Sequence, residues 1–261
     1  MTRMTWTLGC FGYLALAACG SDVASTNAAS TEGNPMASNL EVLGRAGGPR
    51  NVQAFEPHSV PFGIRMERWS EKLWDWVYSV PSAENPLLDT TGVDCAVQQP
   101  DGPVWYLPSV VGPGGTASFT RTCTIPHDKA LLFEMSGVVN DFPCPDPTFK
   151  PADGQTLYEF LLAGAEGGPN SITAQSLSVD GVFLKHLFDY RETSRDLFEV
   201  TGDLSLQTTL DGCITGSPQP AVSDAFVLML KPLSSGPHTL VYNIQDNHGT
   251  NLTLTFNLTV Q

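Results

Sequence analysis

Positive charge is scarce in this chain of 261 residues. It has 13 Lys and Arg residues against 27 Asp and Glu residues, which gives a formal net charge of −14. Nucleic acids and anionic lipid headgroups are recognised through basic patches. The charge balance therefore argues against a nucleic acid partner and against electrostatic docking on anionic lipid.

Motifs that carry catalysis or hold cofactors are also missing. The sequence has no Gly-x-Ser-x-Gly nucleophile elbow, no Walker or Gly-x-Gly-x-x-Gly phosphate loop and no His-Glu-x-x-His pattern. None of its cysteines shows the Cys-x-x-Cys spacing that zinc sites favour. These absences predict no catalytic residue, no cofactor and no metal, and they favour a protein that is not an enzyme.

No apolar run reaches the roughly 20 residues that a membrane-spanning helix needs. A shorter uncharged and mostly apolar run covers residues 8–18, follows Arg3, and ends in Leu16-Ala17-Ala18-Cys19. A basic residue, an apolar run of this length and small residues at its end are typical of a secretory signal. The four closing residues resemble the lipobox of bacterial lipoproteins.

That resemblance implies removal of residues 1–18 and lipidation of Cys19 with several acyl chains, palmitate among them. Several chains together give durable anchoring, whereas a single chain holds only marginally. In lipoproteins of this kind Asp after the cysteine favours the inner membrane, so Gly20 favours the outer membrane. The alternative is an ordinary signal peptide cleaved near Ala17 or Ala18, with no lipid.

The region after Cys19 predicts a tether and then one domain. Residues 19–56 are rich in Ser, Ala, Asn, Thr and Gly and show no apolar period, which predicts a disordered tether. About 200 residues remain, 57–261, enough for a single β-rich domain. The 20 Pro and 24 Gly of the chain indicate many turns.

Four cysteines remain after processing: Cys95, Cys123, Cys144 and Cys213. An even number in an exported chain predicts two disulfides. Of the three pairings, Cys95–Cys123 with Cys144–Cys213 is preferred because its loops neither nest nor cross. The alternatives are the other pairings and a zinc site.

Two helices are expected. Over residues 64–79 apolar side chains recur at spacings of three and four, with charges on the other side, and Pro81 ends the pattern. Trp74 and Tyr78 lie one turn apart, off the main apolar stripe. A second short helix is predicted over residues 154–165, with Asp153 as N-cap.

Strand patterns dominate from residue 103 onward. The last strand alternates cleanly between apolar and polar residues, as a half-buried antiparallel strand does. Short strands separated by turns predict a mainly β fold, an antiparallel β-sandwich. The predicted strands cover residues 104–111, 116–125, 129–135, 171–179, 182–188, 204–210, 225–230, 238–245 and 251–260.

Several phrases occur in an order that resembles an uncharacterised family of bacterial secreted proteins. They are Trp74-x-Trp76, Asn85-Pro86, Asp89-x-Thr91-Gly92, Gly102-Pro103-Val104-Trp105-x-Leu107, Arg121-x-Cys123-Thr124-Ile125-Pro126, Lys129-Ala130-Leu131-Leu132-Phe133, Leu230-Lys231-Pro232-Leu233-x-x-Gly236-x-His238-Thr239 and Asn257-Leu258-Thr259-Val260. The resemblance covers residues 69–261 and implies no activity.

Carboxylates leave two chemical alternatives open. A glycosidase needs two carboxylates about 5–10 Å apart, and a carboxylate-dependent polysaccharide hydrolase is therefore the alternative function. Three acidic residues form a candidate calcium site through oxygen ligands, although their spacing matches no EF-hand. The hydrolase candidates are Asp89, Asp94, Glu134, Asp141 and Asp189, and the calcium candidates are Asp141, Asp146 and Asp153.

The preferred interpretation is a lipid-anchored protein of the cell envelope whose domain binds a protein or glycan, or has a structural role, without catalysis. It contacts the membrane through the lipid alone. Trp74, Tyr78, Asp89 and Trp105 are the candidate ligand-binding residues.

Overall fold

The computed structural model describes residues 52–112 and 114–261. The predicted signal peptide, Cys19 and most of the predicted tether lie outside the described residues. The last residues of that tether are part of the fold. Ala54 pairs with Leu230, and the backbone N–H of Phe55 donates to the carbonyl of Met229 at 2.8 Å.

The described part of the chain is mainly β, with ten strands in two five-stranded sheets. The first sheet has the order β1-β3-β8-β6, and β7 also pairs with β8. Its strands are β1 (Val104–Pro108), β3 (Ala130–Asp141), β6 (Arg191–Thr193), β7 (Phe198–Val200) and β8 (Gln219–Leu230).

The second sheet has the order β2-β10-β9-β4-β5. Its strands are β2 (Thr116–Ile125), β4 (Ile172–Val179), β5 (Val182–Phe183), β9 (Gly236–Asp246) and β10 (Asn251–Val260). The predicted alternation of β10 is confirmed, because its apolar side chains are buried at every second position.

Both sheets are mixed, so the prediction of a purely antiparallel arrangement is wrong. β1 runs parallel to β3, and β2 runs parallel to β10. The first pairing follows from the order of the strands along the chain. β2 lies between β1 and β3 in sequence but belongs to the other sheet, so the chain re-enters the first sheet in its original direction.

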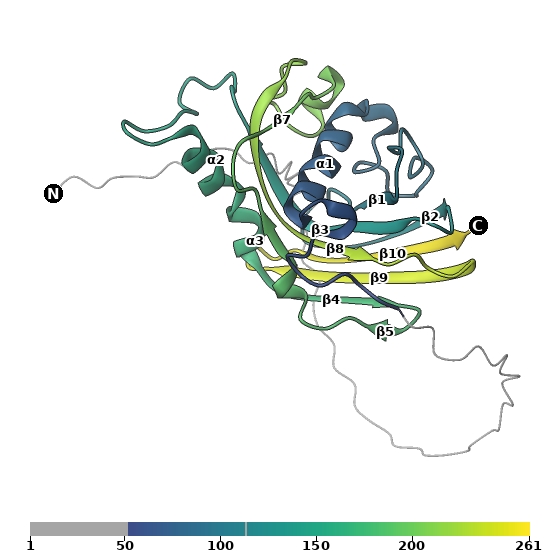
Figure 1. Ribbon diagram of the computed structural model, residues 1–261. Coiled ribbons are helices and arrows are strands. Elements are labelled where there is room, and N and C mark those ends of the chain that lie inside the picture. Colours follow the sequence, from purple (N-terminus) through teal and green to yellow (C-terminus); the bar gives the residue numbers. More distant parts are fainter. Residues whose placement is uncertain (1–51, 113) are drawn as a thin grey trace, which may run out of the picture.

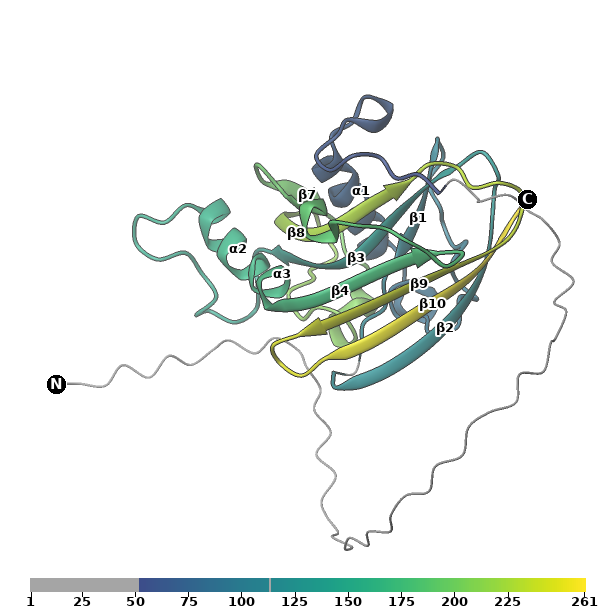
Figure 2. The ribbon, with the colours of Figure 1, turned by 90° about the horizontal axis from the view of Figure 1, so that it is seen from below.

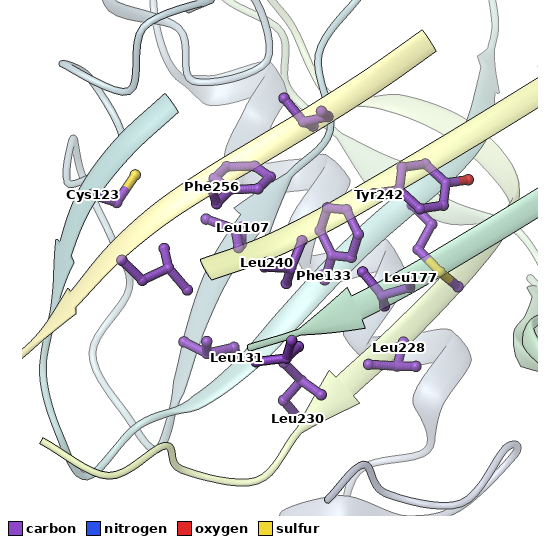
Figure 3. Packing of buried hydrophobic residues seen from close by; sticks show 14 of the residues in the cluster. Leu107, Cys123, Leu131, Phe133, Leu177, Leu228, Leu230, Leu240, Tyr242 and Phe256 are labelled. Carbon is purple, nitrogen blue, oxygen red and sulfur yellow. The ribbon is translucent and has the colours of Figure 1, made fainter. Parts of the chain in front are cut away.

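The two sheets share one apolar core. Phe133 of β3 is fully buried, and its ring centre lies 5.4 Å from that of Tyr242 and 5.8 Å from that of Phe256, both in the second sheet. Figure 3 shows these rings meeting among leucines of both sheets. Edge-to-face contacts of this kind favour one registry of the two layers.

Helix α1 (Met66–Ser79) covers the opposite face of the first sheet (Figures 1 and 2). Alternate residues of β3 and β8 therefore point to different cores. In β8, Leu228 faces the second sheet, whereas Val227 and Met229 face α1. Strands covered on both faces read as continuous apolar runs, which is why residues 225–230 lack a polar alternation.

Helix α2 (Leu157–Ala165) and the short α3 (Gly167–Ser171) follow β3. The predicted N-cap of α2, Asp153, is wrong. Thr156 accepts from the backbone N–H of Glu159, and the Glu159 carboxylate accepts from the backbone N–H of Thr156. This reciprocal capping box satisfies two N–H groups at the start of the helix, which a lone cap at Asp153 would not do.

One predicted strand is wrong, and two are shorter than predicted. The predicted strand 104–111 ends at Pro108. Residues 204–208 form a 3-10 helix, because the Asp203 carboxylate accepts from the backbone N–H of Ser205 and starts a helical turn. The predicted strand 182–188 stops at Phe183. His186 has a left-handed backbone with φ of 59°, and a 3-10 helix follows it over Leu187–Tyr190.

Both disulfides have the preferred pairing. Cys95–Cys123 joins the segment after α1 to β2, across a separation of 28 residues. Cys144–Cys213 joins the chain after β3 to the segment before β8, across 69 residues. The second bond therefore joins the chain just after the end of β3 to the chain before the start of β8, where these two antiparallel strands lie side by side.

Replacing Phe133 with alanine tests the shared core. We expect Phe133→Ala to lower the free energy of unfolding by about 3–5 kcal/mol, because it removes a buried ring and leaves a cavity between the sheets. Chemical denaturation monitored by circular dichroism measures the change. Phe183→Ala is the matched control, since Phe183 is 66% exposed and its loss is expected to cost under about 0.5 kcal/mol. Equal losses in the two variants would contradict the layered core.

Candidate functional site

Two cavities of the described structure lie beside α1, and their linings include residues of β7 and of the segment that follows it. Figure 1 shows where these elements lie. One has a volume of about 210 Å³ and the next about 450 Å³, and both are bordered by Asp75. We call the two together the α1 groove. Its lining residues are Arg68, Glu71, Lys72, Asp75, Ser79, Phe198, Glu199, Thr201, Gly202, Asp203, Leu204 and Gly216.

The α1 groove combines both charges with apolar side chains. Arg68 bridges Glu71 and Asp196, with N–O distances of 2.6 Å to each. Burial raises the pKa of Glu71, and the hydrogen bond from Arg68 opposes this. Burial likewise raises the pKa of Asp75. The groove therefore offers hydrogen-bonding and ionic partners to a polar ligand, beside the apolar surface of Leu204.

The predicted binding residues Trp74 and Tyr78 lie beneath this region and not in it. They are 5% and 1% exposed, and their rings pack edge to face at 6.3 Å. Val200 and Leu206 belong to the same buried cluster as Trp74 and Tyr78. The chain from β7 onward therefore packs against the side of α1 that lies away from its main apolar stripe. These two residues do not form an exposed aromatic surface.

Trp105 and Asp89, the other two predicted binding residues, are also buried and lie apart from Trp74. Trp105 is 9% exposed and belongs to the core between the sheets. Asp89 is 8% exposed and lies in the loop after α1. The structure does not bring the four predicted residues together on one surface.

Asp89 serves an internal ionic contact with Arg121. The Arg121 guanidinium is fully buried, lies 3.8 Å from the Asp89 carboxylate and donates to the carbonyls of Pro86, Pro108 and Ser109. Burial lowers the pKa of Arg121 to about 10, against the opposing influence of Asp89. This arrangement attaches the loop after α1 to β2, so the Asp89 carboxylate is committed to structure.

The hydrolase candidates are scattered. Asp94 donates its backbone N–H to the Asp89 carboxylate, and both lie near Arg121. Asp189 lies in the 3-10 helix after β5 and is exposed. Asp141 is at the end of β3 and is 1% exposed. The structure thus does not place two of the predicted carboxylates opposite each other in the α1 groove.

Asp141 has a partner that sequence reasoning missed. Its carboxylate lies within 4.8 Å of a carboxylate oxygen of Asp211. Burial, followed by the charge of Asp211, raises the pKa of Asp141 to about 8. The other predicted calcium ligands, Asp146 and Asp153, are exposed and are not part of this group.

A signal for this pair is present in the cysteines. Asp141 precedes Cys144 by three residues, and Asp211 precedes Cys213 by two. Once Cys144 and Cys213 are paired, both carboxylates must lie near the same bond. The spacing rules for EF-hands do not reveal such a pair, because its two members are contributed by distant segments.

Glu134 is an isolated buried carboxyl. It lies at the irregularity in the pairing of β3 with β8 and is 2% exposed. Burial raises its pKa to about 7, opposed by a hydrogen bond with the backbone of Ser109. Burial, and after it the charge of Glu134, raises the pKa of Tyr242. Among the described residues Glu134 has no ion-pair partner, and at 2% exposed it does not form part of the surface.

Comparison with known proteins leaves the family open. No family model and no curated protein matches the chain. Two solved structures are similar over part of it, a chain in the structure of PbICP-C in complex with falcipain-2 and the solution structure of Amebosin. The first is 12% identical with a TM-score of 0.23 and covers 60% of this chain and 98% of its own. The second is 11% identical with a TM-score of 0.20 and covers 56% and 98%. At these TM-scores neither carries a conclusion about fold or function.

Among the described residues no helix combines the length and apolar character that crossing a membrane requires.

Glu134 predicts a pH dependence of stability. Its pKa in the fold, about 7, lies above its ordinary value of 4.5, so folding favours the protonated form. This contribution is complete below pH 4.5 and is lost as the pH rises through 7. The side chain of Glu134→Gln stays neutral at every pH. We expect the free energy of unfolding of this variant to equal that of the wild type near pH 4 and to exceed it by about 3 kcal/mol at pH 8.5.

Urea denaturation of both proteins between pH 4 and pH 8.5 measures this difference. The control is Glu199→Gln, which removes an exposed carboxyl of β7. A wild type and a Glu134→Gln variant whose stabilities run parallel over this pH range would contradict the assignment.

Proposed function

We propose that this protein is exported, lipidated at Cys19 and anchored to the bacterial outer membrane, with a folded domain that binds a ligand without catalysing a reaction. The observation that carries the proposal is the pair of disulfides, Cys95–Cys123 and Cys144–Cys213. Disulfides of this kind persist in oxidising compartments outside the cytosol. The signal-like residues before Cys19 supply the export route.

The architecture of the domain supports a scaffold role. We infer that the two mixed sheets, packed over one core, form a β-sandwich. Sandwiches leave helices and connecting segments on their outside to carry recognition. Here α1 and the chain from β7 onward form the α1 groove on that outside.

The lining of the α1 groove favours a polar ligand of mixed charge. Lys72 is exposed at its edge, and four carboxylates accompany it: Glu71, Asp75, Glu199 and Asp203. Cell-wall glycan with its attached peptides carries hydroxyl, ammonium and carboxylate groups that match this set. We therefore assign envelope glycan as the ligand class.

The alternative, a polysaccharide hydrolase, requires two carboxylates that face the substrate in a cleft. The oxygens of Asp141 and Asp211 lie within 4.8 Å of each other, closer than the roughly 5–10 Å of a glycosidase pair. Asp141 is also 1% exposed and does not line the α1 groove. This burial favours binding over hydrolysis.

Lipidation is tested by metabolic labelling. The wild type expressed in a Gram-negative host is expected to incorporate radiolabelled palmitate, and its mature N-terminus should be a diacylglyceryl cysteine by mass spectrometry. Cys19→Ser should lose the label entirely, because the thioether and the acylated amine both form on that residue. Cys10→Ser is the matched control, since it lies within the predicted signal. An unlabelled wild type cleaved near Ala17 or Ala18 would establish an ordinary secreted protein instead.

Binding is tested with purified peptidoglycan sacculi. We expect the protein to co-sediment with sacculi and to release no reducing ends. Lys72→Glu reverses a charge at the edge of the α1 groove and should weaken binding at least fivefold. Lys150→Glu makes the same change at an exposed position outside the groove and should not. Release of reducing ends would favour the hydrolase, and equal binding of the two variants would overturn the groove as the site.

A further inference from the structure

The feature that the proposed function does not use is the carboxylate pair beside the second disulfide. Asp141 ends β3, and Asp211 lies in the segment that leads to β8. Their carboxylate oxygens and the sulfur of Cys213 all lie within 4.8 Å of one another. That sulfur is bonded to Cys144, so it is no thiolate, and the pair offers oxygen ligands alone.

Asp141 is the unusual member of the pair. It is 1% exposed, and no donor in the described structure meets its carboxylate oxygens with hydrogen-bond geometry. The Asp211 carboxylate can hydrogen-bond to it only when one of the two holds a proton. Among the described residues no Lys, Arg or His forms an ion pair with Asp141 or Asp211. A buried carboxylate without a partner is costly, and a second negative charge beside it adds to the cost.

Asp211, by contrast, is held in place. One carboxylate oxygen accepts from the hydroxyl of Tyr78 at 3.0 Å, and the other accepts from the backbone N–H of Cys213 at 2.8 Å. Tyr78 is itself 1% exposed. Because three rigid elements meet here, α1, the end of β3 and the disulfide, the two carboxylates are oriented before anything binds. Asp211 is half-buried, which leaves a path from solvent.

We propose that Asp141 and Asp211 bind a divalent cation that prefers oxygen ligands, with calcium as the first choice. Calcium accepts mono- and bidentate carboxylates together with water. Asp141 and Asp211 each supply a carboxylate oxygen as a protein ligand, and water completes the shell from the exposed side of Asp211. The cation neutralises the two charges and ties the end of β3 to the segment before β8.

A proton is the competing occupant. Burial, and then the neighbouring Asp211, raises the pKa of Asp141. A proton bound to the pair would therefore reduce the same negative charge that a cation would neutralise. Metal binding requires a deprotonated ligand and therefore displaces that proton. The two occupants make different predictions at alkaline pH, where a bound cation remains and the proton is lost.

The experiment uses the full chain, purified with its disulfides intact and stripped with EDTA, at pH 8.5. Terbium, a luminescent substitute for calcium, is titrated with excitation of Tyr78 and the tryptophans. We expect saturable sensitised luminescence that calcium displaces. Asp141→Asn should weaken terbium binding at least tenfold. Asp153→Asn removes one exposed carboxylate from the same connection between β3 and α2 and should bind as the wild type does.

Folding of the variants is checked independently of metal. Asp141→Asn removes a buried charge, so its near-UV circular dichroism and its Cys144–Cys213 bond should be unchanged. Asp211→Asn is the second variant and should also lose binding. A wild type without saturable luminescence, or an Asp141→Asn variant that binds like the wild type, would overturn the cation site. Either result would leave the pair with a shared proton.

Discussion

The rest of the structure depends on β3 and β8 being covered on both faces. These two antiparallel strands form the centre of the first sheet, with Phe133 and Leu228 facing the second sheet and Val227 and Met229 facing α1. One pair of strands thus holds two cores together. Without α1 the outward-facing residues would be exposed, and without the second sheet Phe133 would lose Tyr242 and Phe256. The packing of α1 and the packing of the second sheet therefore depend on each other, because both cover the same two strands.

Both central strands extend beyond their apolar runs, and polar side chains stabilise these extensions. Asp224 of β8 accepts from the Arg191 guanidinium of β6 at 2.5 Å. The side-chain amide of Gln219 donates to the carbonyls of Pro143 and Cys213. At the end of β3, Asp141 has no such hydrogen bond. Asp224 and Gln219 are as deeply buried as Asp141 and both have such partners, so the comparison singles out Asp141 among these three.

Much of the fold could be predicted from sequence wherever one local pattern determines the element. The alternation in residues 251–260 predicts β10 to the residue, and the three- and four-residue spacing before Pro81 predicts α1. Residues 204–210 have an apolar alternation too, yet Asp203 and Ser205 start a helical turn there. Parallel pairing of β2 with β10 leaves no local trace, because it depends on which sheet each strand joins. β6 and β7 are three residues each, too short for a period to appear.

The candidate site was harder to predict for the same physical reason. Trp74 and Tyr78 lie off the main apolar stripe of α1, where a two-layer contact would leave them at the rim. The chain from β7 onward adds a cover that no pattern within the helix can reveal, and it buries both rings. That cover forms the α1 groove on its outer side, and on its inner side it brings Asp211 to Tyr78 and Asp141. The chain from β7 onward thus contributes residues to both candidate sites. A cation that fixes the segment around Asp211 would therefore also stabilise one side of the α1 groove. Recognition at the groove and cation binding at the disulfide would then be coupled, because both depend on the same stretch of chain being held against α1.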